Sequence, residues 1–363
     1  MIDEVLRSHH EVTPAVLTES LRAARWIPED VSVVDAAITT IGAGQMGICA
    51  RYDLRLDREV ADAPASVVGK FAAEDEQART FMASSGYPNE VCFYRDFASQ
   101  VTIRVPRCAH AAIDDDGGWF TLLLEDLSPM RPGDQLQGCT VAQVEGAVQE
   151  LVGLHAPLWD AAVLHEHPQF SSNAGLADPD VLAGALRAVV PGFIERYGAS
   201  FAPDEVDFYE RLTTSARGWI EARPQGRSLV HSDYRPDNLM FGTGTDGRPT
   251  VAAVDWQGFG KGCALSDVSF IVGNALTADD RRANEERIVR GYHAALVAGG
   301  VDGYAWDECW DEYGRSLLSA LMTTIFGAMY GVRSERGDEM FVIMGARHAR
   351  QILDLGVDSL LAN

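Results

Sequence analysis

The run Val230–Phe241 reads VHSDYRPDNLMF and decides the fold of this chain. It places a histidine, an aspartate and an asparagine in order at His231, Asp233 and Asn238, with Pro236 between the last two. A short segment that carries a proline can hold a carboxylate and an amide at one site. The alternative is that these polar residues only cap and shape a turn. The neighbouring sequence distinguishes the two interpretations.

A hairpin is predicted directly after this run. Leu239–Phe241 and residues 250–254 are largely apolar, and the turn GTGTDGR separates them. The second strand leads into Asp255, in the sequence VDWQ. An acid at the end of a hydrophobic strand is well placed to bind Mg²⁺, because hard cations prefer carboxylate oxygens. The sequence therefore predicts a metal ligand at Asp255.

A glycine-rich loop precedes this region by almost two hundred residues. Ile41–Gly47 reads IGAGQMG, so Gly42, Gly44 and Gly47 satisfy G-x-G-x-x-G. That pattern fits a dinucleotide site, in which a helix follows, or a phosphate flap, in which a strand follows. Residues 48–57 alternate between apolar and polar side chains, which predicts a strand and favours the flap. An ordinary glycine-rich hairpin is the remaining alternative.

The order His231, Asp233 and Asn238 matches the H-x-D-x-x-x-x-N pattern of a kinase catalytic loop. In that pattern Asp233 accepts or orients the proton of an attacking hydroxyl, and Asn238 gives an oxygen to Mg²⁺. Asp255 then takes the place of the D-F-G aspartate, followed here by Trp256 and a glutamine. We expect His231 to be structural, hydrogen-bonded to the loop backbone.

A single lysine, Lys70, lies inside the apolar strand predicted at residues 66–72. Such a lysine is costly unless it is paired. In the kinase pattern it binds the α- and β-phosphates of ATP and pairs with a glutamate of the next helix, for which Glu90 is the candidate. Glu74 and Glu76 are alternatives, but they follow the strand too closely and have the pattern of solvated side chains.

Adenine is expected to contact the chain where an apolar strand ends. Residues 119–127, WFTLLLEDL, predict this strand, and the main chain of Glu125 and Leu127 would contact the base. A further acid, Asp267 in LSDVSFI, is expected to brace the catalytic loop rather than to bind metal.

The predicted secondary structure changes near residue 128. Before it, strands are predicted, including a hairpin of residues 108–113 and 119–125; after it, helices dominate. Thr140 and Gln143 form a capping box, and Asp178 precedes a proline at a helix start. Further helical patterns cover residues 204–222, 278–298, 306–330 and 338–355. We expect an α+β fold with a small strand-rich lobe, residues 1–127, and a larger helical lobe, residues 128–363.

At these residues the sequence resembles the aminoglycoside phosphotransferase-like kinases, closest to their ecdysteroid-kinase-like and choline-kinase-like branch. The resemblance rests on a set of motifs: IGAGQMG, SVVGKF, EVCFY, LLLEDL, GDQL, LVGLHAPLW, VHSDYRPDNLMF and VDWQ. It implies a two-lobed protein-kinase-like fold with an antiparallel sheet in the small lobe. It also implies ATP and Mg²⁺ as cofactors. No activation loop ending in A-P-E is found, which argues against a protein substrate.

Composition limits the partners and the compartment. The formal net charge of −23 disfavours nucleic acid and anionic membranes as partners. Six scattered cysteines with no C-x-x-C pair indicate a reducing cytosol, so a cytoplasmic location is expected. The first residues contain acids and no apolar run, which predicts no signal peptide. No apolar stretch approaches the ~18 residues that a membrane span needs.

The sequence thus predicts an ATP-dependent small-molecule kinase. We expect it to transfer the γ-phosphoryl group to a hydroxyl of a neutral or weakly polar acceptor. Apolar residues at helical spacing in 306–330 favour a core face, although part of that face could line the acceptor pocket: Met322, Phe326, Met329 and Tyr330. The alternatives are an aminoglycoside phosphotransferase, a nucleotide-binding pseudokinase that acts as an interaction module, and a dinucleotide-dependent oxidoreductase. Neither the acceptor nor the oligomeric state follows from the sequence.

Overall fold

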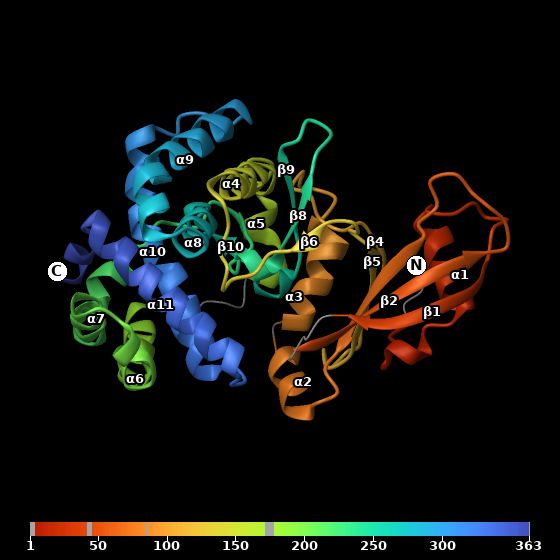
Figure 1. The fold of residues 1–363 in the computed structure, drawn as a ribbon, viewed down its shortest axis with the longest axis horizontal. Helices are drawn as coiled ribbons and strands as arrows, with labels where there is room; N and C mark the ends of the chain where they lie inside the picture. Colours follow the sequence, from red (N-terminus) through yellow and green to blue (C-terminus); the bar gives the residue numbers. More distant parts are fainter. Residues whose placement is uncertain (1–3, 42–45, 85, 171–177, 363) are drawn as a thin grey trace. The chain divides into compact units, whose positions relative to one another are not determined.

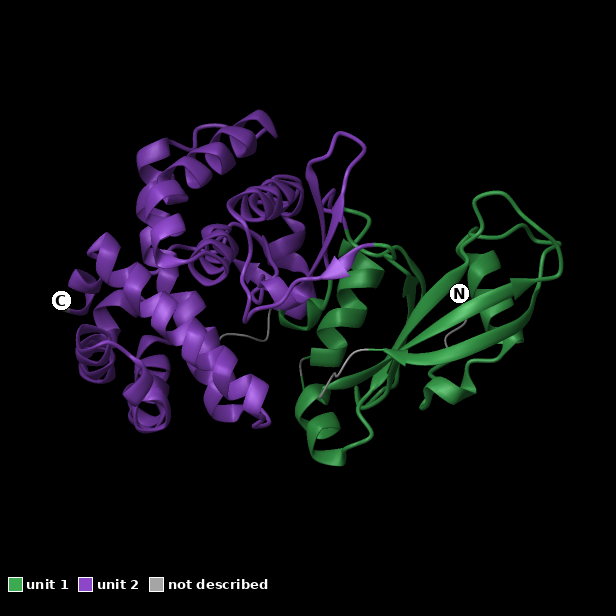
Figure 2. Ribbon diagram, viewed as in Figure 1, with its two compact units in different colours: residues 1–100, 105–129, 254–258 green, residues 101–104, 130–253, 259–363 purple. Residues whose placement is uncertain are grey.

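The structure is a computed structural model that describes residues 4–41, 46–84, 86–170 and 178–362. The chain forms two compact units, drawn in separate colours in Figure 2. Unit 1 contains residues 1–100, 105–129 and 254–258, and unit 2 contains residues 101–104, 130–253 and 259–363. The chain passes between the units more than once, because residues 101–104 already belong to unit 2. The chain returns to unit 1 at 254–258, the segment that carries Asp255.

Unit 1 is built on a five-stranded antiparallel sheet with strand order β1-β2-β3-β5-β4 (Figure 1). Its strands are β1 (Val33–Ile41), β2 (Gly47–Leu56), β3 (Ser66–Ala72), β4 (Cys108–Ile113) and β5 (Phe120–Glu125). A strand follows the glycine loop, as the alternation in 48–57 predicts. The dinucleotide alternative, which needs a helix there, is therefore excluded. Lys70 lies in the central strand β3, paired across to β2 and β5.

Three helices accompany this sheet: α1 (Pro14–Ala23), α2 (Glu76–Ala83) and α3 (Gly86–Cys92). A short π-helical segment, Phe93–Phe97, continues α3. Apolar side chains of α1 and of the first three strands form one buried cluster that includes Leu17, Leu21, Tyr52, Val67 and Phe71. The sheet thus has a core of its own, which fixes β3 and its lysine.

Unit 2 is mainly helical. Its helices are α4 (Val141–His155), α5 (Val163–Glu166), α6 (Pro179–Tyr197), α7 (Pro203–Glu221), α8 (Leu265–Ala275), α9 (Ala278–Ala298), α10 (Trp306–Tyr330) and α11 (Glu335–Leu355). The capping box at Thr140 and Gln143 is present, and Asp178 caps α6. The sequence did not predict α5 or α8. The antiparallel sheet together with this helical unit confirms the expected α+β class.

Short strands surround the catalytic run. It lies between β7 (Ser228–Val230) and β8 (Leu239–Thr243), and β8 pairs with β9 (Pro249–Ala253) in the predicted hairpin. Two short strands complete these sheets: β6 (Arg131–Pro132) pairs with β8, and β10 (Gly260–Gly262) pairs with β7. The run is therefore held at both ends by sheet pairing.

The apolar face of α10 is largely core. Met322 is buried, and Phe326 and Met329 pack against the same cluster, which α6, α7 and α11 complete. Only Tyr330 is well exposed, at 62%. The core interpretation of this face thus accounts for three of the four residues, so it gives no support to an apolar acceptor pocket. Within the described residues, none of the helices combines the length and apolarity that crossing a membrane requires.

Candidate active site

The backbone of the catalytic run is fixed by a buried acid. Asp267, in the first turn of α8, accepts hydrogen bonds from the main-chain N–H of His231 (2.7 Å) and of Ser232 (2.9 Å). The Nδ1 atom of His231 accepts the N–H of Asp233 at 3.3 Å. Ser232 has φ = +68°, an unfavourable conformation that these bonds stabilise. His231 and Asp267 are thus placed as expected, as structural supports.

Asp233 and Asn238 lie in direct contact. The Nδ2 atom of Asn238 donates to Oδ2 of Asp233 at 2.7 Å and to its carbonyl oxygen at 2.9 Å. Asn238 closes the short 3₁₀ turn Pro236–Asn238 and is only 5% exposed. With Nδ2 committed to Asp233, Oδ1 is the atom of the amide that could bind a metal.

The sequence analysis missed two residues of this run. Arg235 donates from Nε to both carboxylate oxygens of Asp233, at 3.1 and 3.2 Å. Asp237 accepts from Nη1 of Arg235 at 2.8 Å. Both lie inside the VHSDYRPDNLMF run, between Asp233 and Asn238. Their opposite charges were the available signal that they pair with each other and with Asp233. The kinase pattern leaves these two positions unspecified.

In unit 1, Lys70 lies between two acids. Its Nζ atom is 2.7 Å from Oε2 of Glu90 and 3.0 Å from Oδ1 of Asp255. Burial opposes the charge on Lys70, but the two carboxylates outweigh it and raise the pKa of the ammonium group above its ordinary value. The expected pair of Lys70 with Glu90 is therefore present. Glu74 and Glu76 are exposed, which agrees with their interpretation as solvated side chains rather than as partners of Lys70.

Asp255 belongs to this group because its segment packs on α3. The ring of Trp256 stacks on Phe93 with centroids 3.7 Å apart, and Nε2 of Gln257 donates to Glu90 at 3.4 Å. Asp255 itself has φ = +66°, which costs energy for a residue with a side chain. The contacts of the two residues that follow Asp255 stabilise that conformation, and its carboxylate contacts Lys70.

The predicted phosphate loop is described only at its end. Gly42 and Gly44 lie outside the described residues. Gly47 begins β2 opposite Ala72, where a Cβ would come within 2.8 Å of the carbonyl oxygen of Phe71. That approach explains why glycine is needed at position 47.

At the end of β5, the main-chain N–H of Glu125 donates to the carbonyl oxygen of Arg107 at 2.8 Å. This N–H is therefore committed to the sheet edge. Leu127, two residues on, is 9% exposed. The prediction of adenine contacts narrows to the carbonyl group of Glu125 and the main chain of Leu127.

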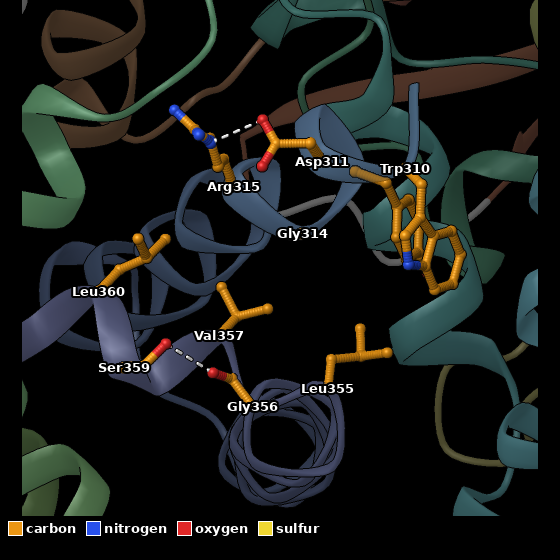
Figure 3. Close-up of a pocket in the computed structure, with 10 residues that line it drawn as sticks. Trp310, Asp311, Gly314, Arg315, Leu355, Gly356, Val357, Ser359 and Leu360 are labelled. Atoms are coloured by element: carbon orange, nitrogen blue, oxygen red, sulfur yellow. Dashed lines mark hydrogen bonds and ion pairs between the residues drawn. The ribbon is translucent and has the colours of Figure 1, made fainter. Parts of the chain in front are cut away.

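A separate pocket of about 260 Å³ lies in unit 2 and contains none of the predicted site residues. Figure 3 shows its apolar walls from α10 and the C-terminal segment, with the ion pair of Asp311 and Arg315 at its edge. Trp310 and Leu355 lie on one side of it. Its titratable side chains have structural partners: Asp311 pairs with Arg315, and Tyr313 donates to Glu285. The pocket therefore adds nothing to the candidate active site.

Comparison with known families identifies the chain. Residues 75–308 match the model of the phosphotransferase enzyme family. The chain belongs to that family. The match contains Glu90, Asp233, Asn238 and Asp255, whereas the glycine loop and Lys70 precede it. The family confirms the resemblance found in the sequence, and with it the assignment as a small-molecule kinase.

Solved structures of similar fold agree. A choline kinase from Cryptosporidium parvum has a TM-score of 0.54 at 11% identity, covering 97% of this chain and 100% of its own. A GDP complex of wild-type aminoglycoside 2'-phosphotransferase-IIIa has a TM-score of 0.53 at 13% identity, covering 94% of this chain and all of its own. At these identities the likeness shows the kinase-like fold. Comparison with curated proteins finds no match for this chain.

Proposed function

We propose that this phosphotransferase transfers the γ-phosphoryl group of ATP to a hydroxyl of a small molecule, with Mg²⁺ as cofactor. The observation that carries the proposal is the arrangement of Lys70 between Glu90 and Asp255, all within unit 1. A buried lysine of raised pKa stays charged, so it can bind phosphate oxygens. Glu90, at 1% exposure, fixes its position.

The donor set suits magnesium. Asp255 offers a carboxylate and Asn238 an amide oxygen, and oxygen ligands of this kind are what Mg²⁺ prefers. Asp255 contacts Lys70 and Asn238 contacts Asp233, so each ligand has a partner that orients it. When bound, Mg²⁺ would neutralise charge on the phosphates. Gly42, Gly44 and Gly47 would cover the phosphates, and Glu125 and Leu127 would contact the base.

Asp233 is the proposed catalytic residue. Its carboxylate would accept or orient the proton of the acceptor hydroxyl while the oxygen attacks the γ-phosphorus. The new P–O bond forms as the bond to the β-phosphate oxygen breaks, and ADP leaves. Asn238 and Arg235 hold the carboxylate from two sides, so little reorganisation is needed during transfer.

For the acceptor, we propose a neutral hydroxylated molecule. Two acids connected to Asp233 through Arg235 and Arg336 are already paired: Asp237 contacts both arginines, and Asp134 contacts Arg336. A polycationic aminoglycoside needs several acids that it can pair with, and these would have to exchange their arginines. The aminoglycoside phosphotransferase therefore remains the second candidate, supported by the structural neighbours rather than by the charges.

A two-stage experiment tests the proposal. Thermal shifts with ATP and with GTP, each with and without Mg²⁺, identify the nucleotide; GTP is included because a structural neighbour holds GDP. Phosphorylation is then screened with sugars, lipophilic alcohols, sterols, choline and aminoglycosides. A phosphorylated neutral alcohol supports the proposal. Transfer only to aminoglycosides would establish the second candidate, and nucleotide binding without hydrolysis or transfer would indicate a pseudokinase.

A further inference from the structure

Asp237 is the centre of a hydrogen-bond network beside the catalytic run. Its Oδ1 atom accepts the main-chain N–H of Gln135 at 2.8 Å. Arg336 binds it with both arms of its guanidinium group, Nη1 to Oδ2 and Nη2 to Oδ1, each at 2.9 Å. Arg235 adds a fourth bond at 2.8 Å. Four donors on one carboxylate that is 15% exposed leave it a single orientation.

That orientation determines where Arg235 points. Its Nη1 atom is bound to Asp237, and its Nε atom lies against Asp233. The guanidinium group is planar and rigid, so fixing one nitrogen fixes the direction of the others. The sulfur of Met340 contacts the same Nη1 atom at 3.4 Å, and the side chain is 17% exposed. Arg235 therefore has little freedom apart from the contact with Asp233.

Charge supports the same arrangement. Two guanidinium groups, those of Arg235 and Arg336, lie against the Asp237 carboxylate at 2.8 and 2.9 Å. Arg336 lies in the first turn of α11, which Ser334 caps by accepting the N–H of Gly337 at 3.1 Å. The anchor of the network is thus a helix 99 residues further along the chain.

We propose that Asp237 and Arg336 are positioning residues for phosphoryl transfer: together they hold Arg235 against Asp233, so that α11 sets the geometry of the catalytic carboxylate. The inference rests on the proposed role of Asp233. A displacement of about 1 Å at a reacting group can lower turnover ~100-fold, so a network at this distance from the chemistry is able to control the rate. Neither residue needs to touch a substrate for this effect.

The first test reads the network without activity. The Nε–H resonance of Arg235 in the full chain is assigned by its loss in Arg235→Lys. Asp237→Asn keeps an acceptor for Gln135 and removes the charge; Arg336→Gln removes the anchor. Both should shift or broaden the Arg235 signal. Arg333→Gln is the matched control, because Arg333 is 67% exposed and pairs with Asp338 instead. An Arg235 signal unchanged in both test variants would overturn the proposal.

The second test measures turnover, using MgATP with water as the acceptor. Asp237→Asn and Arg336→Gln should each lower kcat by ~10-fold or more, while the KM for ATP stays within ~2-fold. Arg336→Lys should recover part of the loss, and the double variant should be no slower than the slower single variant. Wild-type kcat in both single variants overturns the proposal. If wild-type protein neither hydrolyses ATP nor phosphorylates any acceptor of the panel, the proposed function fails, and the Arg235 resonance alone decides this inference.

Discussion

The Nζ atom of Lys70 lies 2.7 Å from Oε2 of Glu90, although 20 residues of sequence separate them. Their side chains are 12% and 1% exposed, so water screens the pair very little. Burial raises the pKa of the Glu90 carboxyl, and the ammonium group of Lys70 opposes that rise. The two residues therefore depend on each other for their charges, and the first prediction follows from this dependence.

Lys70→Ala should remove nucleotide binding and also destabilise the free protein. It leaves the buried Glu90 carboxylate without its cation, which typically costs on the order of 3–5 kcal/mol. Urea unfolding measures this loss, and thermal shift with MgATP measures the binding. Lys261→Ala is the control, because Lys261 lies in unit 2 on an exposed contact with His165. Normal nucleotide stabilisation in Lys70→Ala would show that Lys70 does not bind the phosphates.

Asp255→Ala should abolish the part of nucleotide stabilisation that depends on Mg²⁺. The variant removes a proposed metal ligand and also relieves Lys70 of one of its two acids. Thermal shift with an ATP analogue, titrated with Mg²⁺ and repeated with EDTA, separates metal-dependent from metal-independent binding. Asp246→Ala, in the exposed β8–β9 turn, is the control. If wild type and Asp255→Ala gain equal stability from Mg²⁺, Asp255 is not a ligand.

His348 should make the protein sensitive to acid. It is fully buried on α11, where burial lowers its pKa from 6.5 to about 3, and Nδ2 of Asn274 lies 3.0 Å from its Nε2. Below pH 6.5 the imidazole of His348 binds a proton in the unfolded chain, whereas in the folded chain it stays neutral down to about pH 3. The free energy of unfolding therefore falls as the pH drops from 6.5 towards 3, by about 1.4 kcal/mol per pH unit from this residue.

His348→Gln removes that titration and should flatten the pH dependence. Urea unfolding of wild type and variant at several values between pH 4 and 6.5 gives the two slopes. The variant is expected to be less stable at pH 7, because it changes a packed site, yet to lose less stability on acidification. Parallel slopes would mean that His348 is protonated in the folded protein.

Much of the fold was predictable because its signals are local. The alternation of residues 48–57 predicted β2, and SVVGKFA predicted β3 with the limits that the structure shows, residues 66–72. By contrast, α8 was missed because its sequence, LSDVSFIVGNA, is buried on nearly every side. A helix without a polar face shows no 3.6-residue periodicity. Of this helix, the sequence singled out only Asp267, as a brace for the catalytic loop. Its hydrogen bonds with the main chain of His231 and Ser232 agree with that expectation.

The site was predictable where one run of sequence contains it. His231, Asp233 and Asn238 lie within eight consecutive residues and are in contact through the loop backbone and side chains. The pair of Arg336 and Asp237 had no such signal, because it joins positions 99 residues apart and both residue types are common on surfaces. The return of 254–258 to unit 1 is likewise a matter of packing, set by Trp256.

The most direct test of the central claim is a ³¹P NMR time course of MgATP with a hydroxylated acceptor panel, run on wild type and Asp233→Asn. Wild type should convert ATP into ADP and a phosphomonoester in equal amounts. Asp233→Asn keeps the size of the side chain but not its charge; it should bind nucleotide and react at least ~100-fold more slowly. Equal rates in the two proteins, or no phosphomonoester and no nucleotide binding in wild type, would contradict the account.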